Sequence, residues 1–388
     1  MNQKKVVHVS TFKPEECGIA SWTQDVIDYS IHEDPYLINR VVAMNVSRRP
    51  EEYPDFVDFC IEKERIEDYI DAAEFLNSDE GTDLVSIQHE FGIFGGNQGD
   101  YLIEFLDRLK KPSLLTCHTV PRQQETDRKS RERREVLSRI LPRVTSIMAI
   151  SQTATNILQT EYKIKPEKIS KIYHGTHDFS ESRDEAKKII GNLEDRFVIS
   201  TVGLVRPKRG MEKVIHALPD VVKKHPHMLY HIAGKTHPKE LINGNDPYRK
   251  MLQEETRRLG LEDNIRFTNH YLPLNSLLRN IRASDLGITP YSNVGQISSG
   301  VLSYYLGLGV PVISTPFLYA QEVLADGRGI ILPELDNSDA ITDTLLDVLD
   351  NPKKLEQMKA NMAPFTEQMR WPNVAKQYVK EERKLIKT

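Results

Sequence analysis

The sequence has few cysteines and no long apolar run. Among 388 residues there are three cysteines, Cys17, Cys60 and Cys117, and no two of them form a CxxC pair. This set provides neither a disulfide framework nor a zinc site. No window approaches the roughly 20 apolar residues of a membrane-spanning helix, and the N-terminal stretch lacks the apolar core of a signal peptide. We therefore expect a soluble, cytoplasmic protein.

Neither sign of charge dominates the chain. Lys and Arg number 52 and Asp and Glu 56, which leaves a net charge of -4. This balance excludes a chain whose whole surface attracts nucleic acid, and we expect no nucleic-acid partner. Hydrophobic residues make up 39%, which is enough for folded cores. At about 150 residues per domain, the length predicts two or three domains.

Motifs that identify several common enzyme classes are also absent. The sequence has no DxD pair to clamp a nucleotide-bound divalent metal, no GxxxxGK[ST] phosphate loop and no GxSxG nucleophile elbow. We therefore expect an enzyme that binds phosphate with cations and backbone dipoles, and that needs neither a metal nor another cofactor.

Short β-branched runs alternate with amphipathic stretches along the chain. The run Val6 to Val9 predicts a buried strand, and a helical pattern follows from Ala20. This alternation predicts an α/β protein with parallel sheets covered by helices. It pauses in the polar segment His174 to Arg196, which is the best linker candidate, and resumes with a strand at Phe197 to Gly203. The sequence thus predicts two doubly wound, Rossmann-like domains facing a cleft.

The loop after the predicted strand Phe197 to Gly203 holds three cations, Arg206, Lys208 and Arg209, ahead of an apolar helix. A helix N-terminus offers free backbone N–H groups and about half a positive charge. Together with the three cations it predicts an anion site, for which phosphate is the usual occupant. Taken alone, the loop fits a solvated charged surface equally well.

Small residues follow the predicted strand Leu286 to Thr289 and open the next helix. They let backbone N–H groups approach a ligand closely. Helix capping by a serine is the alternative, but it does not account for a glycine on each side of the two serines. The run consists of Gly295, Gln296, Ile297, Ser298, Ser299 and Gly300.

Two histidines of the first half, His89 and His118, each stand where a predicted strand ends. A lone histidine there is more often structural, but two in equivalent positions favour a ligand site. The segment Asp127 to Arg139 holds six cations and three anions. It is typical of a solvated helix laced with ion pairs. Peripheral contact of Arg128–Arg139 with a membrane surface or an anionic acceptor is the alternative.

These loops resemble those of the retaining nucleotide-sugar glycosyltransferases of the GT-B fold, family 4. The most specific match is Leu308 to Thr315, LGVPVIST, which is similar to the family's CGVPVVAT. Gly203 to Gly210 resembles the donor phosphate loop GRLxxxKG, with Arg209 in place of the lysine and Leu204 where an arginine is usual. The resemblance covers nearly the whole chain. It implies an acceptor-side domain at 1–178, a nucleotide-sugar domain at 184–365 and a helix at 366–388 that returns to the first domain.

The resemblance also implies roles for individual residues. His118 would contact the transferred sugar, with Gly18 and His89 beside it. Arg209, helped by Arg206 or Lys208 and by the backbone N–H groups of Ile297–Gly300, would neutralise the leaving diphosphate. The loop that includes Tyr271 and Leu272 would hold the nucleotide base through its backbone.

The chain lacks two glutamates that the family usually carries eight positions apart, before the CGVPVVAT motif. In the family these glutamates contact the donor sugar and the ribose of the donor. Gly295 and Ser303 occupy their places, and Gln296 and Glu322 are the candidate replacements.

The resemblance implies metal-independent transfer of a hexose, with retention, from a nucleoside-diphosphate sugar to a carbohydrate or glycoconjugate acceptor. The alternatives are a nucleotide-sugar epimerase of the same fold and a degenerate sugar- or nucleotide-binding protein without catalysis. Neither the base, the sugar, the acceptor nor the oligomeric state follows from the sequence.

Overall fold

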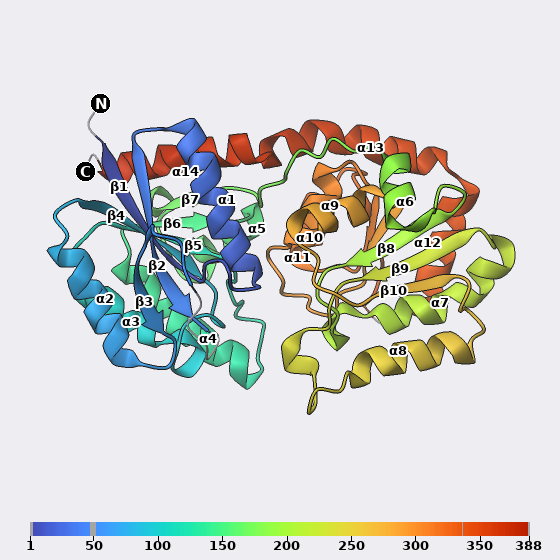
Figure 1. Ribbon diagram of the computed structural model, residues 1–388, viewed down its shortest axis with the longest axis horizontal. Coiled ribbons are helices and arrows are strands. Elements are labelled where there is room, and N and C mark those ends of the chain that lie inside the picture. The colour runs from blue at the N-terminus through green and yellow to red at the C-terminus, as the bar shows by residue number, and fades with distance from the viewer. Residues whose placement is uncertain (1–2, 47–51, 336, 387–388) are drawn as a thin grey trace. The chain divides into compact units, whose positions relative to one another are not determined.

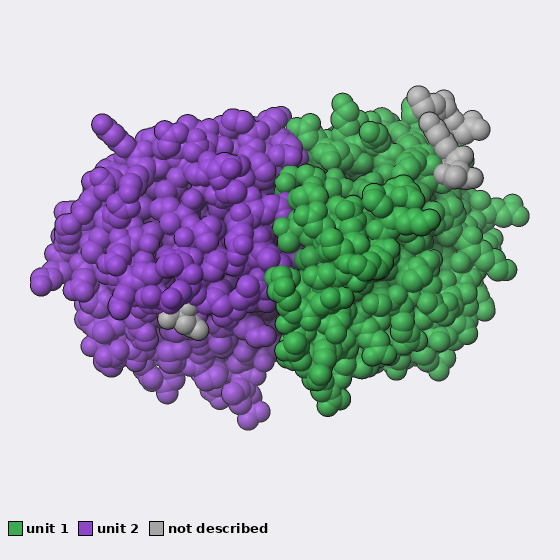
Figure 2. Space-filling model, turned by 180° about the vertical axis from the view of Figure 1, so that it is seen from behind, with its two compact units in different colours: residues 1–174, 371–388 green, residues 175–370 purple. Residues whose placement is uncertain are grey.

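The computed structural model describes residues 3–46, 52–335 and 337–386. The chain divides into two compact units, which Figure 2 colours separately. Unit 1 comprises Met1–His174 and Trp371–Thr388, and unit 2 comprises Gly175–Arg370. Each unit is built on one parallel sheet with flanking helices (Figure 1). This confirms the predicted α/β class and its two doubly wound sheets.

The sheet of unit 1 has the strand order β3-β2-β1-β4-β5-β6-β7, and every described pair is parallel. Its strands are β1 (Lys4–Ser10), β2 (Leu37–Asn45), β3 (Val57–Glu62), β4 (Thr82–His89), β5 (Ser113–Cys117), β6 (Ser146–Ala149) and β7 (Ile169–Lys171). Its helices are α1 (Gly18–Glu33), α2 (Ile66–Ser78), α3 (Tyr101–Arg108), α4 (Arg128–Ile140), α5 (Gln152–Thr160) and α14 (Trp371–Ile386).

The sheet of unit 2 has the order β10-β9-β8-β11-β12-β13, again parallel throughout the described pairs. Its strands are β8 (Phe197–Val202), β9 (Met228–Ala233), β10 (Ile265–Thr268), β11 (Leu286–Thr289), β12 (Val312–Ser314) and β13 (Ile330–Ile331). Its helices are α6 (Arg183–Gly191), α7 (Met211–Lys224), α8 (Pro247–Arg258), α9 (Leu274–Arg282), α10 (Gly300–Gly307), α11 (Leu318–Val323), α12 (Ser338–Asp350) and α13 (Lys353–Thr366).

Each sheet has one point where the strand order reverses. In unit 1 this point lies between β1 and β4, and in unit 2 it lies between β8 and β11. The loops that leave two such neighbouring strands turn to opposite faces of the sheet, so a crevice forms at their carboxyl ends, where ligands of open parallel sheets bind. The loops that the sequence assigns to phosphate or sugar follow β1, β4, β8, β11 or β5. The loop assigned to the base follows another strand.

The segment from His174 to Arg196 is not only a linker, because it contains α6. This helix begins at a capping box, in which the Ser182 hydroxyl accepts the Glu185 N–H at 3.3 Å and Glu185 Oε2 accepts the Ser182 N–H at 2.8 Å. The Ser-x-x-Glu spacing is the sequence signal for this helix start.

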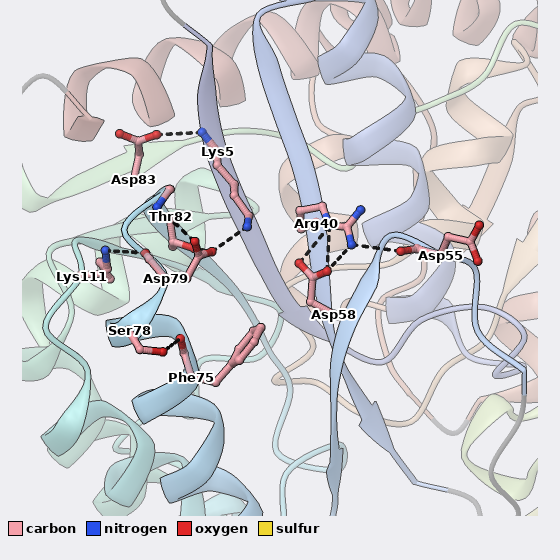
Figure 3. A network of polar contacts seen from close by, with 11 residues as sticks. Lys5, Arg40, Asp55, Asp58, Phe75, Ser78, Asp79, Thr82, Asp83 and Lys111 are labelled. Carbon is pink, nitrogen blue, oxygen red and sulfur yellow. Dashed lines mark hydrogen bonds and ion pairs between the residues drawn. The ribbon is translucent and has the colours of Figure 1, made fainter.

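Ion pairs secure the strands of unit 1 near their amino ends (Figure 3). Lys5 Nζ lies 2.6 Å from Asp79 Oδ2, and the Lys5 backbone N–H donates to Asp83 Oδ2 at 2.8 Å. Arg40 pairs with Asp58 across β2 and β3. These groups are partly exposed, so each pair contributes little to stability. Lys5 connects β1 with β4 and with the turn before it, and Arg40 connects β2 with β3, near the amino ends of these strands and away from the ligand-binding loops.

Helix α14 completes unit 1 from the other end of the chain. Trp371 is fully buried, its ring stacks on Tyr29 at 5.6 Å, and it packs against Trp22 at 5.1 Å. At the far end of the helix Arg383 Nε donates to Asp34 Oδ2 at 2.6 Å. The C-terminal residues are therefore part of the core of unit 1. Within the described residues, no helix is both long and apolar enough to cross a membrane.

We predict that Trp371→Ala lowers the free energy of unfolding of unit 1 by about 3–5 kcal/mol, because it removes a fully buried indole and leaves a cavity. Hydrogen exchange of the β1 amides measures this loss. Ile31→Ala on α1, whose side chain is 46% exposed, serves as the control in the same unit and should change stability by about 0.5 kcal/mol or less. A loss below about 1 kcal/mol for Trp371→Ala would show that the indole is not part of this core.

Candidate functional site

The cationic loop of unit 2 runs from the end of β8 to the start of α7. Residues Pro207–Arg209 form a single 3-10 turn, and Gly210 then reverses the chain with a φ of 66°. A Cβ atom at position 210 would lie 2.2 Å from the carbonyl oxygen of Pro290, just after β11. Glycine is therefore required here, both for its conformation and for the close approach of the two loops.

Arg209 lies where these two loops meet. Its guanidinium carbon is 4.2 Å from the ring centroid of Tyr291, and Nη1 donates to the Tyr291 hydroxyl. The Tyr291 ring is itself stacked on Phe317 at 5.3 Å. Among the described residues no carboxylate pairs with Arg209, and its buried Nε has no hydrogen-bond partner. The structure therefore holds an uncompensated cation in place with aromatic rings, which favours an anionic ligand.

The electrostatic effect of this loop is visible at His237. Burial lowers the pKa of His237, the positive charges of Arg206 and Lys239 lower it further, Glu240 opposes them, and Arg209 adds the smallest lowering effect. Lys208 is exposed, and its carbonyl oxygen accepts the Ser292 N–H at 3.1 Å. Two of the three predicted cations, Arg206 and Arg209, therefore act on one neighbouring side chain.

The glycine- and serine-rich loop follows β11 and opens α10. Ser299 caps this helix by accepting the Leu302 N–H at 3.3 Å, so the capping alternative holds for this serine. The side chain of Gln296 donates to the carbonyl oxygen of Ser298 at 2.8 Å, Ile297 is buried, and Ser298 and Gly300 are partly exposed. The loop thus presents the amino end of α10 beside the carboxyl end of β11.

Neither position that replaces a family glutamate offers a carboxylate. Gly295 has no side chain, and Ser303 is fully buried, where its hydroxyl donates to the Ser299 carbonyl at 2.9 Å and bonds the Tyr319 hydroxyl at 2.8 Å. Glu322 lies on α11 and is partly exposed. Ser303 is therefore a structural residue of this unit.

A pocket of about 430 Å³ lies at the carboxyl ends of β9 and β10. Tyr271 lines it, whereas Leu272 is buried and is not among the lining residues. The cationic loop is joined to this pocket through the backbone, because the Val205 N–H donates to the Lys235 carbonyl at 2.9 Å. The lining residues are Lys235, Thr236, Leu241, Gly244, Asp246, Asn269, His270 and Tyr271.

A buried arginine that the sequence did not single out, Arg249, bonds to two residues that line this pocket, Thr236 and Asp246. Arg249 is 4% exposed, and its Nη2 donates to the Gly234 carbonyl at 2.7 Å. Its Nε donates to Asp246 Oδ2 at 3.2 Å. Asp246 also caps α8 by accepting the Arg249 N–H at 3.0 Å. The sequence signal was the Asp-Pro pair at 246 and 247, which is typical of a helix start.

In unit 1 the two predicted histidines lie next to each other, because β4 and β5 are neighbours. The backbone N–H of His118 donates to the backbone carbonyl of His89 at 3.0 Å. The ring atom Nε2 of His118 lies 3.0 Å from Gln88 Oε1. The Trp22 and His118 rings meet in a T-shaped arrangement with their centroids 5.3 Å apart. Burial lowers the pKa of His118 to about 3, and the neighbouring His174 and His89 contribute. The ring is therefore neutral at physiological pH.

His89 is fully buried, with its ring 4.8 Å from Phe91 and 6.0 Å from Phe94. Neither ring nitrogen has a hydrogen-bond partner among the described residues. Burial lowers the pKa of His89 to about 4, and Arg133 contributes to the shift. Gly18 is exposed at the start of α1, and no atom lies within 4 Å of the place a Cβ would take.

The basic segment forms α4 together with its N-cap, Asp127. Several of its cations are engaged within unit 1. Arg128 pairs with Glu132 at 2.7 Å, Arg133 lies over Phe91 at 5.1 Å, and Arg134 donates to the Gln123 carbonyl at 3.3 Å. These contacts agree with the interpretation of α4 as a solvated helix whose charged side chains form local contacts and ion pairs.

We predict that His89 makes unit 1 less stable in acid. Its pKa of about 4 in the folded state is below the value of 6.5 for a free histidine, so the unfolded chain binds more protons between these two pH values. Stability should therefore fall as pH drops from about 7 to about 5, by about 2 kcal/mol on account of this residue. His89→Gln, which does not titrate, should reduce the fall measured by denaturant unfolding.

The control for this prediction is Phe91→Leu, which disturbs the same packing but leaves every histidine in place. It should keep the full loss between the two pH values. A His89→Gln variant with the same loss as the unaltered chain would contradict the assignment.

Two models of glycosyltransferase families match the chain: Glycosyl transferases group 1 over residues 182–363 and Glycosyltransferase Family 4 over residues 70–178. The GDP-mannose-dependent α-(1-6)-phosphatidylinositol monomannoside mannosyltransferase of Mycolicibacterium smegmatis is 26% identical over 171 residues, which span 43% of this chain and 42% of that relative.

Solved structures match the fold over almost the full length. Sucrose-phosphate synthase from Thermosynechococcus elongatus aligns with a TM-score of 0.79 at 13% identity, covering 98% of this chain and 99% of that one. Anabaena HepE in complex with UDP and glucose aligns with a TM-score of 0.71 at 14% identity, covering 97% and 99%. Since family models match both halves of the chain, it belongs to the family 4-like glycosyltransferases of the GT-B fold.

Proposed function

We propose that the protein transfers a hexose, with retention of configuration, from a nucleoside-diphosphate sugar to a carbohydrate or glycoconjugate acceptor. The observation that supports this most is Arg209, an uncompensated cation held on Tyr291 at the strand reversal of unit 2. The cationic loop continues through Val205 into a pocket large enough for a nucleoside. The structure of HepE with UDP and glucose supports a donor of this class.

In this proposal unit 2 binds the donor. Arg209, with Arg206 and Lys208, lies against the diphosphate, and the backbone N–H groups of Ile297–Gly300 add hydrogen bonds. Negative charge grows on the diphosphate as the bond to the sugar breaks, so these fixed positive groups stabilise the transition state more than the ground state. Because the chain itself supplies this charge, we propose that transfer needs no divalent metal.

Unit 1 would hold the acceptor and face the transferred sugar. The neutral His118 ring can exchange a hydrogen bond with a sugar hydroxyl without introducing a charge beside the oxocarbenium-like centre. His89 would support His118 through the backbone hydrogen bond between them, and exposed Gly18 would leave room beside the sugar. The acceptor oxygen would bond to the anomeric carbon on the face from which the diphosphate leaves. Its proton would pass to the departing phosphate oxygen.

The acceptors that we propose include lipid-linked sugars. The mannosyltransferase relative acts, by its name, on phosphatidylinositol monomannoside, a lipid-linked sugar. A lipid-linked acceptor would bring unit 1 to a membrane surface, and Arg128–Arg139 of α4 is the segment that we propose for this contact.

Incubation with a panel of UDP-, GDP- and ADP-sugars in the presence of a chelator separates the three candidate functions. Release of nucleoside diphosphate that depends on an acceptor, with the product in the donor's anomeric configuration, is the result we expect. An epimerised sugar nucleotide would identify an isomerase instead. Binding without any turnover would identify a non-catalytic binding protein. The absence of the family's glutamates at positions 295 and 303 would agree with that result.

We predict that Arg209→Ala lowers kcat for sugar transfer by about 100- to 1,000-fold, because it removes the group that faces the developing charge. Arg209→Lys keeps the charge but loses the planar stacking on Tyr291, so an intermediate loss is expected. The steady-state rate of nucleoside diphosphate release measures both. Lys223→Ala at the other end of α7 changes the net charge equally and should leave kcat unchanged; a rate for Arg209→Ala equal to this control would refute the phosphate assignment.

We further predict that Tyr271→Ala weakens binding of the preferred nucleoside diphosphate, because Tyr271 lines the pocket proposed for the base and its ring would add to the backbone contacts of this loop. A loss of about 1–2 kcal/mol, or roughly tenfold in Kd, is expected from removing one aromatic contact. Titration calorimetry measures it. Tyr36→Ala, on an exposed surface of unit 1, should bind as tightly as the unaltered protein. If Tyr271→Ala also binds the nucleoside diphosphate as tightly as the unaltered protein, the base binds elsewhere.

A further inference from the structure

Tyr378 on α14 reaches into the middle of the unit 1 sheet. Its hydroxyl is fully buried, accepts the side-chain N–H of Gln88 at 2.8 Å and shares a hydrogen bond with the Thr116 hydroxyl. Gln88 and Thr116 are partners in the register of β4 and β5. A tyrosine from the end of the chain thus contacts two adjacent strands immediately before His89 and His118.

The same Gln88 side chain reaches His118. Its Oε1 lies 3.0 Å from His118 Nε2. Because the Gln88 amide nitrogen donates to Tyr378, its carbonyl oxygen is the atom that faces the histidine. An amide oxygen only accepts, so His118 Nε2 must hold the ring proton, and the neutral ring then has its lone pair on Nδ1.

The environment makes this chain of hydrogen bonds rigid. Gln88 and Thr116 are fully buried and His118 is 7% exposed, and hydrogen bonds among such groups are strong because water does not compete. Burial raises the pKa of Tyr378 to about 12, so its hydroxyl keeps its proton under working conditions. The Trp22 ring also packs against the imidazole, at an interplanar angle of 89°.

We propose that Tyr378 is a positioning residue for His118. Acting through Gln88, it selects the Nε2-protonated tautomer and fixes the plane of the ring. The C-terminal helix would then contribute to the chemistry of unit 1 as well as to its packing. This inference rests on the proposed function only where it concerns the rate of transfer, because the tautomer of His118 is a property of the chain itself.

Docking of α14 and orientation of His118 depend on separate contacts, so the two roles can be told apart. Glu381, on the same helix, accepts hydrogen bonds from Ser146 at 2.8 Å and from Ser170 at 2.9 Å. These bonds join α14 to β6 and β7 without touching Gln88 or His118. Ser146→Ala is therefore a matched control, since it also removes one buried hydrogen bond between α14 and the sheet.

The test measures ring nitrogen chemical shifts in the full-length protein labelled with ¹⁵N-histidine, with the His118 signals assigned from a His118→Gln spectrum. In Tyr378→Phe we expect the Nε2-protonated form of His118 to lose its dominance, and kcat to fall about tenfold with KM for the donor unchanged. In Ser146→Ala we expect the tautomer of His118 and kcat to stay as in the unaltered protein. If Tyr378→Phe does not fold, Gln88→Met is measured in the same way.

An unchanged tautomer in a folded Tyr378→Phe or Gln88→Met protein would overturn the inference. So would an equal effect of Ser146→Ala on the tautomer, which would reduce Tyr378 to helix docking. A changed tautomer with an unchanged kcat would support the positioning of His118 by Tyr378 and would refute the role proposed for His118 in transfer. The ring measurement needs no substrate. An unaltered protein that transfers no sugar would therefore refute the proposed function, while the tautomer would still decide whether Tyr378 controls His118.

Discussion

The close approach of Gly210 to the carbonyl oxygen of Pro290 is the constraint on which the candidate donor site depends. No other residue fits at position 210, because a Cβ would lie 2.2 Å from that oxygen and the backbone has a φ of 66°. This contact joins the loops that follow β8 and β11. It places Arg209 on Tyr291, and Tyr291 on Phe317, so that a guanidinium is held in place by rings and has no carboxylate partner among the described residues. In the proposed function, a cation held in this way is preorganised to bind the donor phosphates.

Unit 1 follows a related plan with different chemistry. Its candidate site is buried and neutral, since burial holds His118 and His89 uncharged. Helix α14 supplies both the Trp371 packing against Trp22 and the Tyr378 hydroxyl beneath Gln88. One unit thus offers positive charge suited to a leaving diphosphate, and the other offers an uncharged ring suited to a sugar. This division of labour is what the proposed transfer requires.

The sequence predicted the architecture well because short buried strands between amphipathic helices leave a clear periodicity. It also placed His89 and His118 each at the end of a strand, and the structure shows that these two strands, β4 and β5, are neighbours. It did not predict α6, whose capping-box signal stands in a polar segment, or Arg249, whose role depends on tertiary contacts with Gly234 and Asp246. The bond from Tyr378 to Gln88 joins residues far apart in the chain, and nothing in local pattern reports such a pairing.

The account is tested most directly by comparing the affinities of nucleoside diphosphates and monophosphates for the unaltered protein, by titration calorimetry in the presence of a chelator. If the Arg209 loop binds the diphosphate, the diphosphate of the preferred base should bind at least about tenfold more tightly than its monophosphate, or about 1.4 kcal/mol. Equal affinities, or binding of the diphosphate only when a divalent metal is restored, would contradict the central claim that cations of this chain hold the leaving group.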